Sequence, residues 1–243
     1  MMKNIFVSLF AMAVVVGAFA AGSTAAAQTP PDFSGFWLSP GADITVALSP
    51  GQEISLTPFG AERYKKVDMA DSPSYKCLPY GPIRGTSSTW PYMIVQTPGI
   101  IAFLIEQVDY RVIYMDGRKH PDDILDYPEW MGHSIGRWEG DTLVVDTIGM
   151  RDETWLDTAG LEHSAKLHVI EKIQKTGPDT LKWTITLEDP VFFTHPFTFE
   201  RTSRRMAKNT RMMSARCADG EGSLENAQRG NQGPEHKNPP KMP

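Results

Sequence analysis

Cysteine is scarce in this 243-residue sequence, and so are the motifs of a metal centre. Structural zinc sites need closely spaced cysteine and histidine ligands, and zinc proteases carry His-Glu-x-x-His on one helix. Neither pattern occurs, so the sequence predicts no metal and no cofactor. The alternative is a metal ion assembled from His120, His133 and His163, which lie in separate loops.

The two cysteines, Cys77 and Cys217, lie far apart in the sequence. In an exported protein two thiols most often form one disulfide, which here would join an early loop to the end of the last predicted strand. Two buried free thiols are the alternative, because spacing alone does not decide geometry.

Long apolar runs are missing after the first 27 residues. Those residues are typical of a secretion signal: Lys3 is followed by an apolar run over 5–21 and by three alanines at 25–27, which predicts cleavage before Gln28. An uncleaved membrane anchor is the alternative, but the run is short for a bilayer span. The sequence therefore predicts a periplasmic or secreted protein with no membrane span after cleavage.

A basic excess is also missing, since 24 Lys and Arg residues stand against 29 Asp and Glu. Without Lys3 the balance is 23 to 29, a net charge of −6. A nucleic-acid footprint needs the opposite sign, so nucleic acid is excluded as a partner. The oligomeric state stays open.

Helix signals are few, and strand signals are many. Only residues 58–69, after a Thr57-Pro58 cap, predict a helix. A β-hairpin is predicted at 131–150, with strands at 134–138 and 142–148 and a turn at Gly140. The other predicted strands are 32–37, 44–48, 92–96, 100–107, 110–115, 166–175, 181–187, 197–201 and 211–217.

About nine or ten of these short strand candidates, with close turn signals, predict an all-β fold, an antiparallel lipocalin-like barrel with one short helix. Long loops at 71–91, 118–129 and 151–163 would cover its ends, the first as a flap pinned by the disulfide. The barrel domain would span 28–217. The Gly-, Pro- and charge-rich segment 218–243 has almost nothing to bury and is predicted to be disordered.

Several predicted strands carry one charge on an otherwise apolar face. The charges are Glu106, Arg111, Asp146, Glu171 and Arg201. All but Asp146 could form ion pairs with one another at the rim of a solid core, or the charges could orient a small molecule inside a hollow barrel. Both interpretations stay open, because a sequence does not reveal a cavity.

Aromatic side chains gather near the predicted loops. A mouth that suits a flat or apolar ligand would use Tyr110, Trp130, Trp138 and Trp155, with Arg151 beside them. The alternative is that these rings anchor loops. The ligand-binding prediction comprises these five residues with Glu106 and Arg201.

Any catalysis would be proton transfer. His133 or His120 is the predicted general base, since an imidazole titrates near neutral pH. Asp146 or Glu171 would be the acid if burial raised its pKa, and Arg111 or Arg151 would hold a developing negative charge. A triad with Ser134 is disfavoured, because neighbouring residues on a strand face opposite sides.

Two segments carry a resemblance: 116–121, which reads DGRKHP, and 132–147, which reads GHSIGRWEGDTLVVDT. They resemble the signature of a large family of exported bacterial proteins, and residues 77–79, 81–84 and 188–190 fit it too. The resemblance spans about 33–217. It implies an exported protein and brings no established activity with it.

Three hypotheses follow. The first is an exported barrel that binds a small apolar or aromatic molecule. The second is a cofactor-free lyase, dehydratase or isomerase acting on such a molecule. The third is a structural envelope protein with a filled core.

Overall fold

A computed structural model of the protein describes residues 29–39, 41, 43–87, 90–106 and 109–213. The predicted secretion signal, the predicted tail at 218–243 and Cys217 lie outside these residues. The predicted strand at 211–217 is described only at 211–213, and those three residues form no strand.

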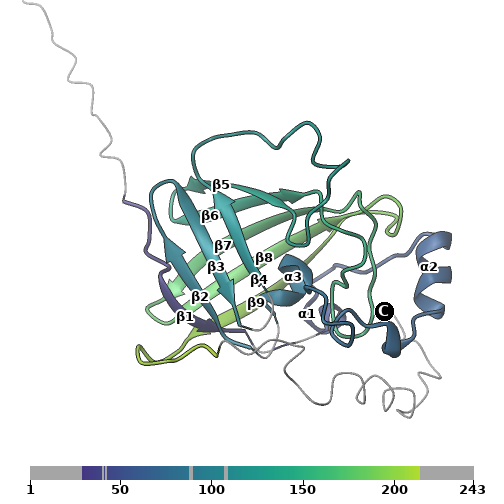
Figure 1. Cartoon of the computed structure of the whole chain (residues 1–243), viewed down its shortest axis with the longest axis horizontal. Helices are drawn as coiled ribbons and strands as arrows, with labels where there is room; N and C mark the ends of the chain where they lie inside the picture. Colours follow the sequence, from purple (N-terminus) through teal and green to yellow (C-terminus); the bar gives the residue numbers. More distant parts are fainter. Residues whose placement is uncertain (1–28, 40, 42, 88–89, 107–108, 214–243) are drawn as a thin grey trace, which may run out of the picture.

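The described chain forms a closed β-barrel, in which each strand pairs with the next and β1 closes on β9 (Figure 1). The all-β barrel prediction is confirmed. The strands are β1 (Gly35–Leu38), β2 (Tyr92–Gln96), β3 (Ile100–Ile105), β4 (Asp109–Tyr114), β5 (His133–Glu139), β6 (Thr142–Ile148), β7 (His168–Gly177), β8 (Thr180–Glu188) and β9 (Phe197–Arg205).

One strand pair departs from the predicted antiparallel order. β4 and β5 are parallel, with Ile113 opposite Ser134 and Tyr114 opposite Ile135. Parallel neighbours need a long connection, and residues 115–132 supply it by arching outside the barrel beside β5 (Figure 1). The hairpin that follows matches the prediction, since β5 and β6 pair from His133–Ile148 to Glu139–Thr142.

Alternation places the core inside the barrel. On β8 the residues Leu181, Trp183, Ile185 and Leu187 are all fully buried, while the residues between them are partly exposed. Successive side chains of a strand point to opposite faces, so this period of two defines an inner and an outer wall. The inner wall is apolar and aromatic for most of its length.

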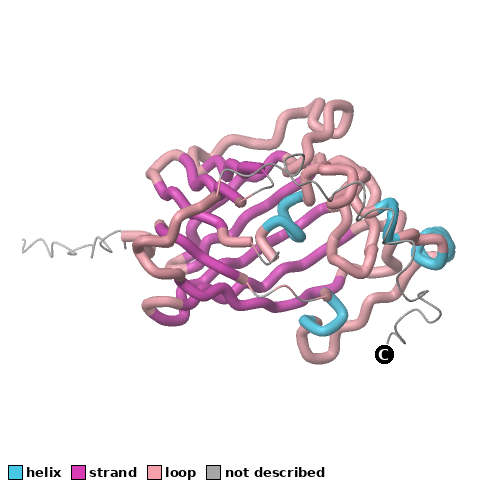
Figure 2. Tube along the Cα trace, turned by 60° about the horizontal axis from the view of Figure 1, so that its bottom comes forward, coloured by secondary structure: helices cyan, strands magenta, loops and turns pink. Residues whose placement is uncertain are grey.

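Three short helices lie at one end of the barrel, with its covering loops (Figures 1 and 2). α2 (Pro58–Lys65) starts as predicted, because the Thr57 hydroxyl accepts from the amide of Gly60 at 3.0 Å. A 3₁₀ turn, η1 (Met69–Asp71), follows it. No helix in the described ranges is long and apolar enough to cross a membrane.

Two helices occupy segments for which none was predicted. α1 (Ile44–Ala47) replaces a predicted strand, since four residues are too few for either periodicity to decide. α3 (Gly81–Gly85) lies within the predicted flap, and all five of its residues are buried. It is the cyan helix inside the barrel mouth in Figure 2, so the predicted flap covers one end of the barrel.

Candidate functional site

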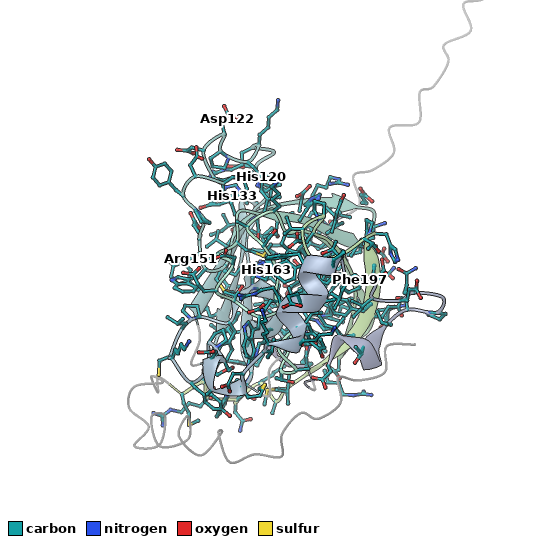
Figure 3. All side chains as sticks on the ribbon, turned by 90° about the vertical axis from the view of Figure 1, so that its right-hand side faces the viewer. His120, Asp122, His133, Arg151, His163 and Phe197 are labelled. Atoms are coloured by element: carbon teal, nitrogen blue, oxygen red, sulfur yellow. The ribbon has the colours of Figure 1, made fainter. Side chains whose placement is uncertain are left out.

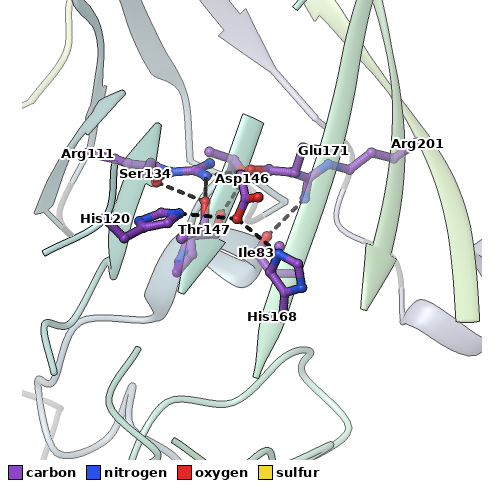
Figure 4. Close-up of polar contacts among 11 residues, drawn as sticks. Ile83, Arg111, His120, Ser134, Asp146, Thr147, His168, Glu171 and Arg201 are labelled. Atoms are coloured by element: carbon purple, nitrogen blue, oxygen red, sulfur yellow. Dashed lines mark hydrogen bonds and ion pairs between the residues drawn. The ribbon is translucent and has the colours of Figure 1, made fainter. Parts of the chain in front are cut away.

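A buried cluster of polar side chains lies on the inner wall. The guanidinium of Arg111 on β4 donates to the Ser134 hydroxyl at 3.0 Å and to the Thr147 hydroxyl at 2.8 Å. It also forms an ion pair with Glu171 on β7. Arg111 is 1% exposed and Glu171 is 0% exposed, so the pair is held away from bulk water. We call these residues, together with Arg201, the inner cluster (Figure 4).

Three buried atoms of the inner cluster have no hydrogen-bond partner within the described chain. They are Nη1 of Arg111, Oε1 of Glu171 and Nε of Arg201. Buried polar atoms are nearly always paired, because an unpaired one costs about 1–3 kcal/mol. Two unpaired donors and one unpaired acceptor in one barrel interior therefore call for a partner.

Arg201 links the inner cluster to the helix in the barrel mouth. It donates to the carbonyl of Ile83 at 2.9 Å and to the hydroxyl of Thr86 at 2.5 Å, and its guanidinium lies over the ring of Trp183. Burial lowers its pKa to about 10, which Glu171 partly opposes. Arg201 therefore stays a cation at neutral pH.

A second polar cluster lies on the outer wall, which we call the outer cluster (Figure 4). Oδ1 of Asp146 on β6 lies 3.2 Å from Nε2 of His120 and 2.9 Å from Nε2 of His168 on β7. Nδ1 of His120 lies 2.8 Å from Nδ1 of His133 on β5. Figure 3 shows His120 and His133 beside one another, far from Phe197 of the inner wall.

Charges within the outer cluster shift its pKa values in different directions. Hydrogen bonds from His168 and His120 hold the pKa of Asp146 below its ordinary value. The same bond to Asp146 raises the pKa of His168. Burial, together with the charges of His120 and Arg118, lowers the pKa of His133. Near neutral pH Asp146 is thus an anion, and His133 is a neutral imidazole.

The structure divides the predicted catalytic residues between the two walls. Arg111 and Glu171 face the interior as predicted. Arg201 does so too, since it shares a face of β9 with Phe197 and Phe199 and lies over the ring of Trp183. His133, His120 and Asp146 lie together outside. Asp146 was expected inside with a raised pKa, but it faces outward and its pKa is lowered, so it does not fit the role of acid. The single pocket containing all five residues is not observed.

Glu106 was placed on the wrong face of its strand. The inner residues of β3 are Ile101, Phe103 and Ile105, one position out of phase with the prediction. Glu106 follows the end of β3, and its carboxylate accepts from the amide of Met213 at 3.0 Å. It is buried, but no contact joins it to the inner cluster within the described residues.

The predicted aromatic mouth is not assembled. Trp138 packs inside the barrel against Phe33, and Trp155 is buried in its loop. Tyr110 faces outward and is 64% exposed. Trp130 lies on the outer loop, where the guanidinium of Arg151 stacks over its ring at 4.2 Å. These aromatic residues are spread over the inside, the outside and the loops.

Ser134 lies in a sequence motif that is found around the nucleophilic serine of many hydrolases, but its place in the fold differs from theirs. Residues 132–136 have the Gly-x-Ser-x-Gly spacing of a hydrolase nucleophile elbow, which needs a sharp strand-to-helix turn. Here Ser134 lies within β5 and bonds Arg111 and Thr147, while His133 points to the other wall. The geometry does not support a serine nucleophile.

The sequence reasoning missed Ser134, Thr147 and His168 as members of the two clusters. Thr147 and Asp146 are neighbours and therefore belong to opposite walls. An antiparallel pairing of 142–148 with 166–175, strands that follow one another in the sequence, would have brought the side chain of His168 to the same wall as Asp146.

The structure bears on the alternative of a three-histidine metal site, but it does not test the predicted disulfide. No group of three or more His, Cys, Asp or Glu side chains in the described ranges is placed to hold a metal ion. His163 is separate from the other two histidines, since its ring bonds Thr154 and the carbonyl of Ser164. The Cys77–Cys217 disulfide stays a prediction, because Cys217 lies outside the described residues.

A cleft of about 270 Å³ opens between α2 and the covering loops, away from both clusters. Its lining includes Arg63, Asp152, Glu162 and His163, and Arg63 and Glu162 already form an ion pair. None of the residues predicted for ligand binding or catalysis lines it.

No family model and no curated protein matches this chain. Among solved structures, a mutant of the fluorescent protein UnaG is similar over 72% of this chain and 96% of its own, with 17% sequence identity and a TM-score of 0.32. This similarity is too distant to carry an argument about function. The strand pairing itself defines the class: a closed nine-stranded β-barrel with a charged cluster inside.

Proposed function

We propose that the barrel binds one small, largely apolar or aromatic molecule through an anionic head group. The observation that carries this proposal is the set of three unpaired buried atoms on Arg111, Glu171 and Arg201. A carboxylate head would accept from the two guanidinium groups. A neighbouring hydroxyl or N–H of the ligand would donate to Glu171.

The charge of the inner cluster supports an anionic head group. Arg111 and Arg201 contribute two positive charges against one negative charge on Glu171, so the cluster carries a net charge of +1 when all three are ionised. A buried net charge costs several kcal/mol unless a counter-ion compensates it. Arginine also matches a carboxylate with two parallel hydrogen bonds.

The walls around the inner cluster support an apolar or aromatic body for the ligand. Trp183 and Phe103 pack edge to face with ring centres 5.8 Å apart, and Tyr92 contacts both rings. Ligand pockets are mostly apolar with a few convergent polar groups, which is the composition of this interior.

Entry of a ligand requires movement. Arg111 and Glu171 are almost completely buried, so a molecule from solvent reaches their unpaired atoms only after a rearrangement. α3 lies in the mouth and is tied to Arg201 by the bonds to Ile83 and Thr86. These two bonds would have to break for α3 to leave the mouth, and the carboxylate would then reach the unpaired Nε of Arg201.

The proposed location is the periplasm or the extracellular space. The leader-like first 27 residues and the resemblance at 116–121 and 132–147 support it. The protein would then carry its molecule outside the cytoplasm.

Native mass spectrometry of protein purified from a bacterial periplasm tests the proposal. We expect one co-purified small anion per chain in the wild type and in Asp146→Asn, which alters only the outer wall. Arg201→Met should lose it, because the cluster then has no net positive charge. The contrary result is a wild type that carries no bound molecule and whose melting temperature is not raised by any aromatic or aliphatic acid. That result would favour a barrel with a filled core.

A further inference from the structure

The outer cluster plays no part in the proposed binding function. Its residues come from β5, β6, β7 and the 115–132 loop, and Asp146 faces away from its inner-wall neighbour Thr147 (Figure 4). Its side chains are buried to different degrees: His133 is 9% exposed, and in the ion pair His120 is 16% and Asp146 is 29% exposed. A chain of hydrogen bonds runs from Asp146 through His120 to His133.

When both imidazoles are neutral, proton counting sets the tautomers along this chain. Asp146 is ionised and only accepts, so Nε2 of His120 must carry a proton. A neutral His120 then has a bare Nδ1, which accepts from Nδ1–H of His133 at 2.8 Å. The second nitrogen of His133, Nε2, is therefore left with its lone pair.

His133 is only 9% exposed, but its Nε2 is not completely buried. Nε2 makes no hydrogen bond within the described chain, and it is absent from the buried polar atoms that lack a partner. The ring is held in place by stacking on Tyr114, with ring centres 5.2 Å apart. The guanidinium of Arg118 covers Tyr114 at 3.9 Å.

The environment of the two rings favours transfer of a captured proton from His133 to His120, beside Asp146. Burial and Arg118 disfavour a cation on His133, whereas His120 lies against the carboxylate of Asp146. A proton taken up at Nε2 of His133 would release the proton on its Nδ1 to His120. The positive charge would then rest beside Asp146 rather than on the desolvated ring.

We propose that Asp146, His120 and His133 form a proton relay that presents Nε2 of His133 as a general base on the outer wall. Its substrate would be a small molecule with a proton acidified by a neighbouring carbonyl, imine or nitro-aromatic group, because a neutral imidazole is only a moderate base. His120 and Asp146 are positioning residues in this proposal.

The first test is the tautomeric state of the histidines, read from ¹⁵N chemical shifts at about pH 8, above the ordinary imidazole pKa. We expect a protonated Nδ1 and a bare Nε2 on His133, and the reverse on His120. A protonated Nε2 on His133 would overturn the proposal. This readout needs no substrate and does not depend on the inner cluster.

The second test uses 5-nitrobenzisoxazole as a probe for a base in an apolar environment. His133 takes the proton from C3, the C–H electron pair forms the third C–N bond, the N–O bond breaks, and a cyano-nitrophenolate leaves. We expect His133→Asn to lower the rate about 100-fold. His195→Asn, at an exposed histidine near Glu53, is the matched control and should not change it. Equal rates in the wild type and His133→Asn would contradict the proposal.

The pH profile separates a relay from a merely structural role. Asp146→Asn removes the anion that stabilises a charged His120, so the midpoint of the rate profile should move to lower pH and the plateau should fall. The charged and titratable groups facing the pair are Tyr114, Asp116, Arg118, Asp146, His168 and Glu188. An unchanged profile in Asp146→Asn would show that the carboxylate only holds the loop.

Discussion

The two walls of one sheet carry two different kinds of polar site. Thr147 on β6 points inward and bonds Arg111, while its neighbour Asp146 points outward and bonds two histidines. Inside, the charges are enclosed by apolar side chains and interact strongly. Outside, water screens them and protons can enter and leave. One strand thus supplies a buried ion-pair site and a titratable site through alternation alone.

Of the variants considered, Arg111→Met on the inner wall should lose the most stability, and it should differ most from a variant of the outer wall. Removal of Arg111 takes away the direct ion-pair partner of the buried Glu171 carboxylate, which should lower the free energy of unfolding by about 3–5 kcal/mol. Asp146→Asn on the other wall should cost about 1 kcal/mol or less. Urea unfolding of both variants measures the two values. Equal losses would show that the walls do not differ.

A double substitution sharpens the same comparison. In Arg111→Met with Glu171→Leu, both members of the direct ion pair are removed and Arg201 keeps the cluster at its wild-type net charge of +1, so most of the stability lost in the single variant should return. Failure to regain stability would mean that Arg111 acts through its bonds to Ser134 and Thr147 rather than through the ion pair.

Ser203→Ala should have the next largest effect. The Ser203 hydroxyl is fully buried and accepts from the Tyr92 hydroxyl at 2.7 Å and from Nε1 of Trp183 at 2.8 Å. Two buried donors would lose their partner, at a cost of about 2–4 kcal/mol in urea unfolding. Thr202→Ala, at the exposed neighbouring position, is the control and should stay within about 0.5 kcal/mol.

His168→Asn should produce a smaller effect that depends on pH. The bond to Asp146 raises the pKa of His168 in the folded protein, so its contribution is complete below the unfolded pKa and vanishes as pH rises through the folded pKa. The variant should therefore lose more stability at about pH 5.5 than at about pH 8.5. A larger loss at the higher pH would contradict the assigned direction.

The smallest effect is expected for Lys182→Ala. Lys182 and Glu200 form an exposed outer-wall ion pair at 2.8 Å, with side chains 44% and 41% exposed. Such pairs contribute at most about 0.5 kcal/mol. A loss above about 1.5 kcal/mol in urea unfolding would show that the outer wall is not screened as the comparison requires.

The sequence was informative where apolar and polar residues alternate. β2 and β6 have the predicted bounds, and in β8 the apolar residues that alternate in the sequence, from Leu181 to Leu187, are the ones that are buried. β3 reads Ile-Ile-Ala-Phe-Leu-Ile, which has no period, so its phase could not be read and Glu106 was misplaced. The segment that forms α1 is too short to distinguish a helix from a strand.

Residues of the candidate sites were likewise predictable only where they lie on strands with a clear alternation of apolar and polar residues. Glu171 and Arg201 lie on strands whose inner faces could be read, and both face inward. Asp146 follows Leu143, Val144 and Val145, an unbroken apolar run that leaves two possible phases. The outer cluster further depends on how the 115–132 loop folds back to bring His120 to Asp146, which no local pattern encodes.

The most direct test compares melting temperatures with an aromatic carboxylic acid and with its neutral methyl ester. If the interior binds an anionic head group, the acid should raise the melting temperature of the wild type and of Asp146→Asn, and the ester should not. The rise should be lost in Arg201→Met. Equal shifts with acid and ester, or a shift abolished by Asp146→Asn, would contradict an anion site on the inner wall.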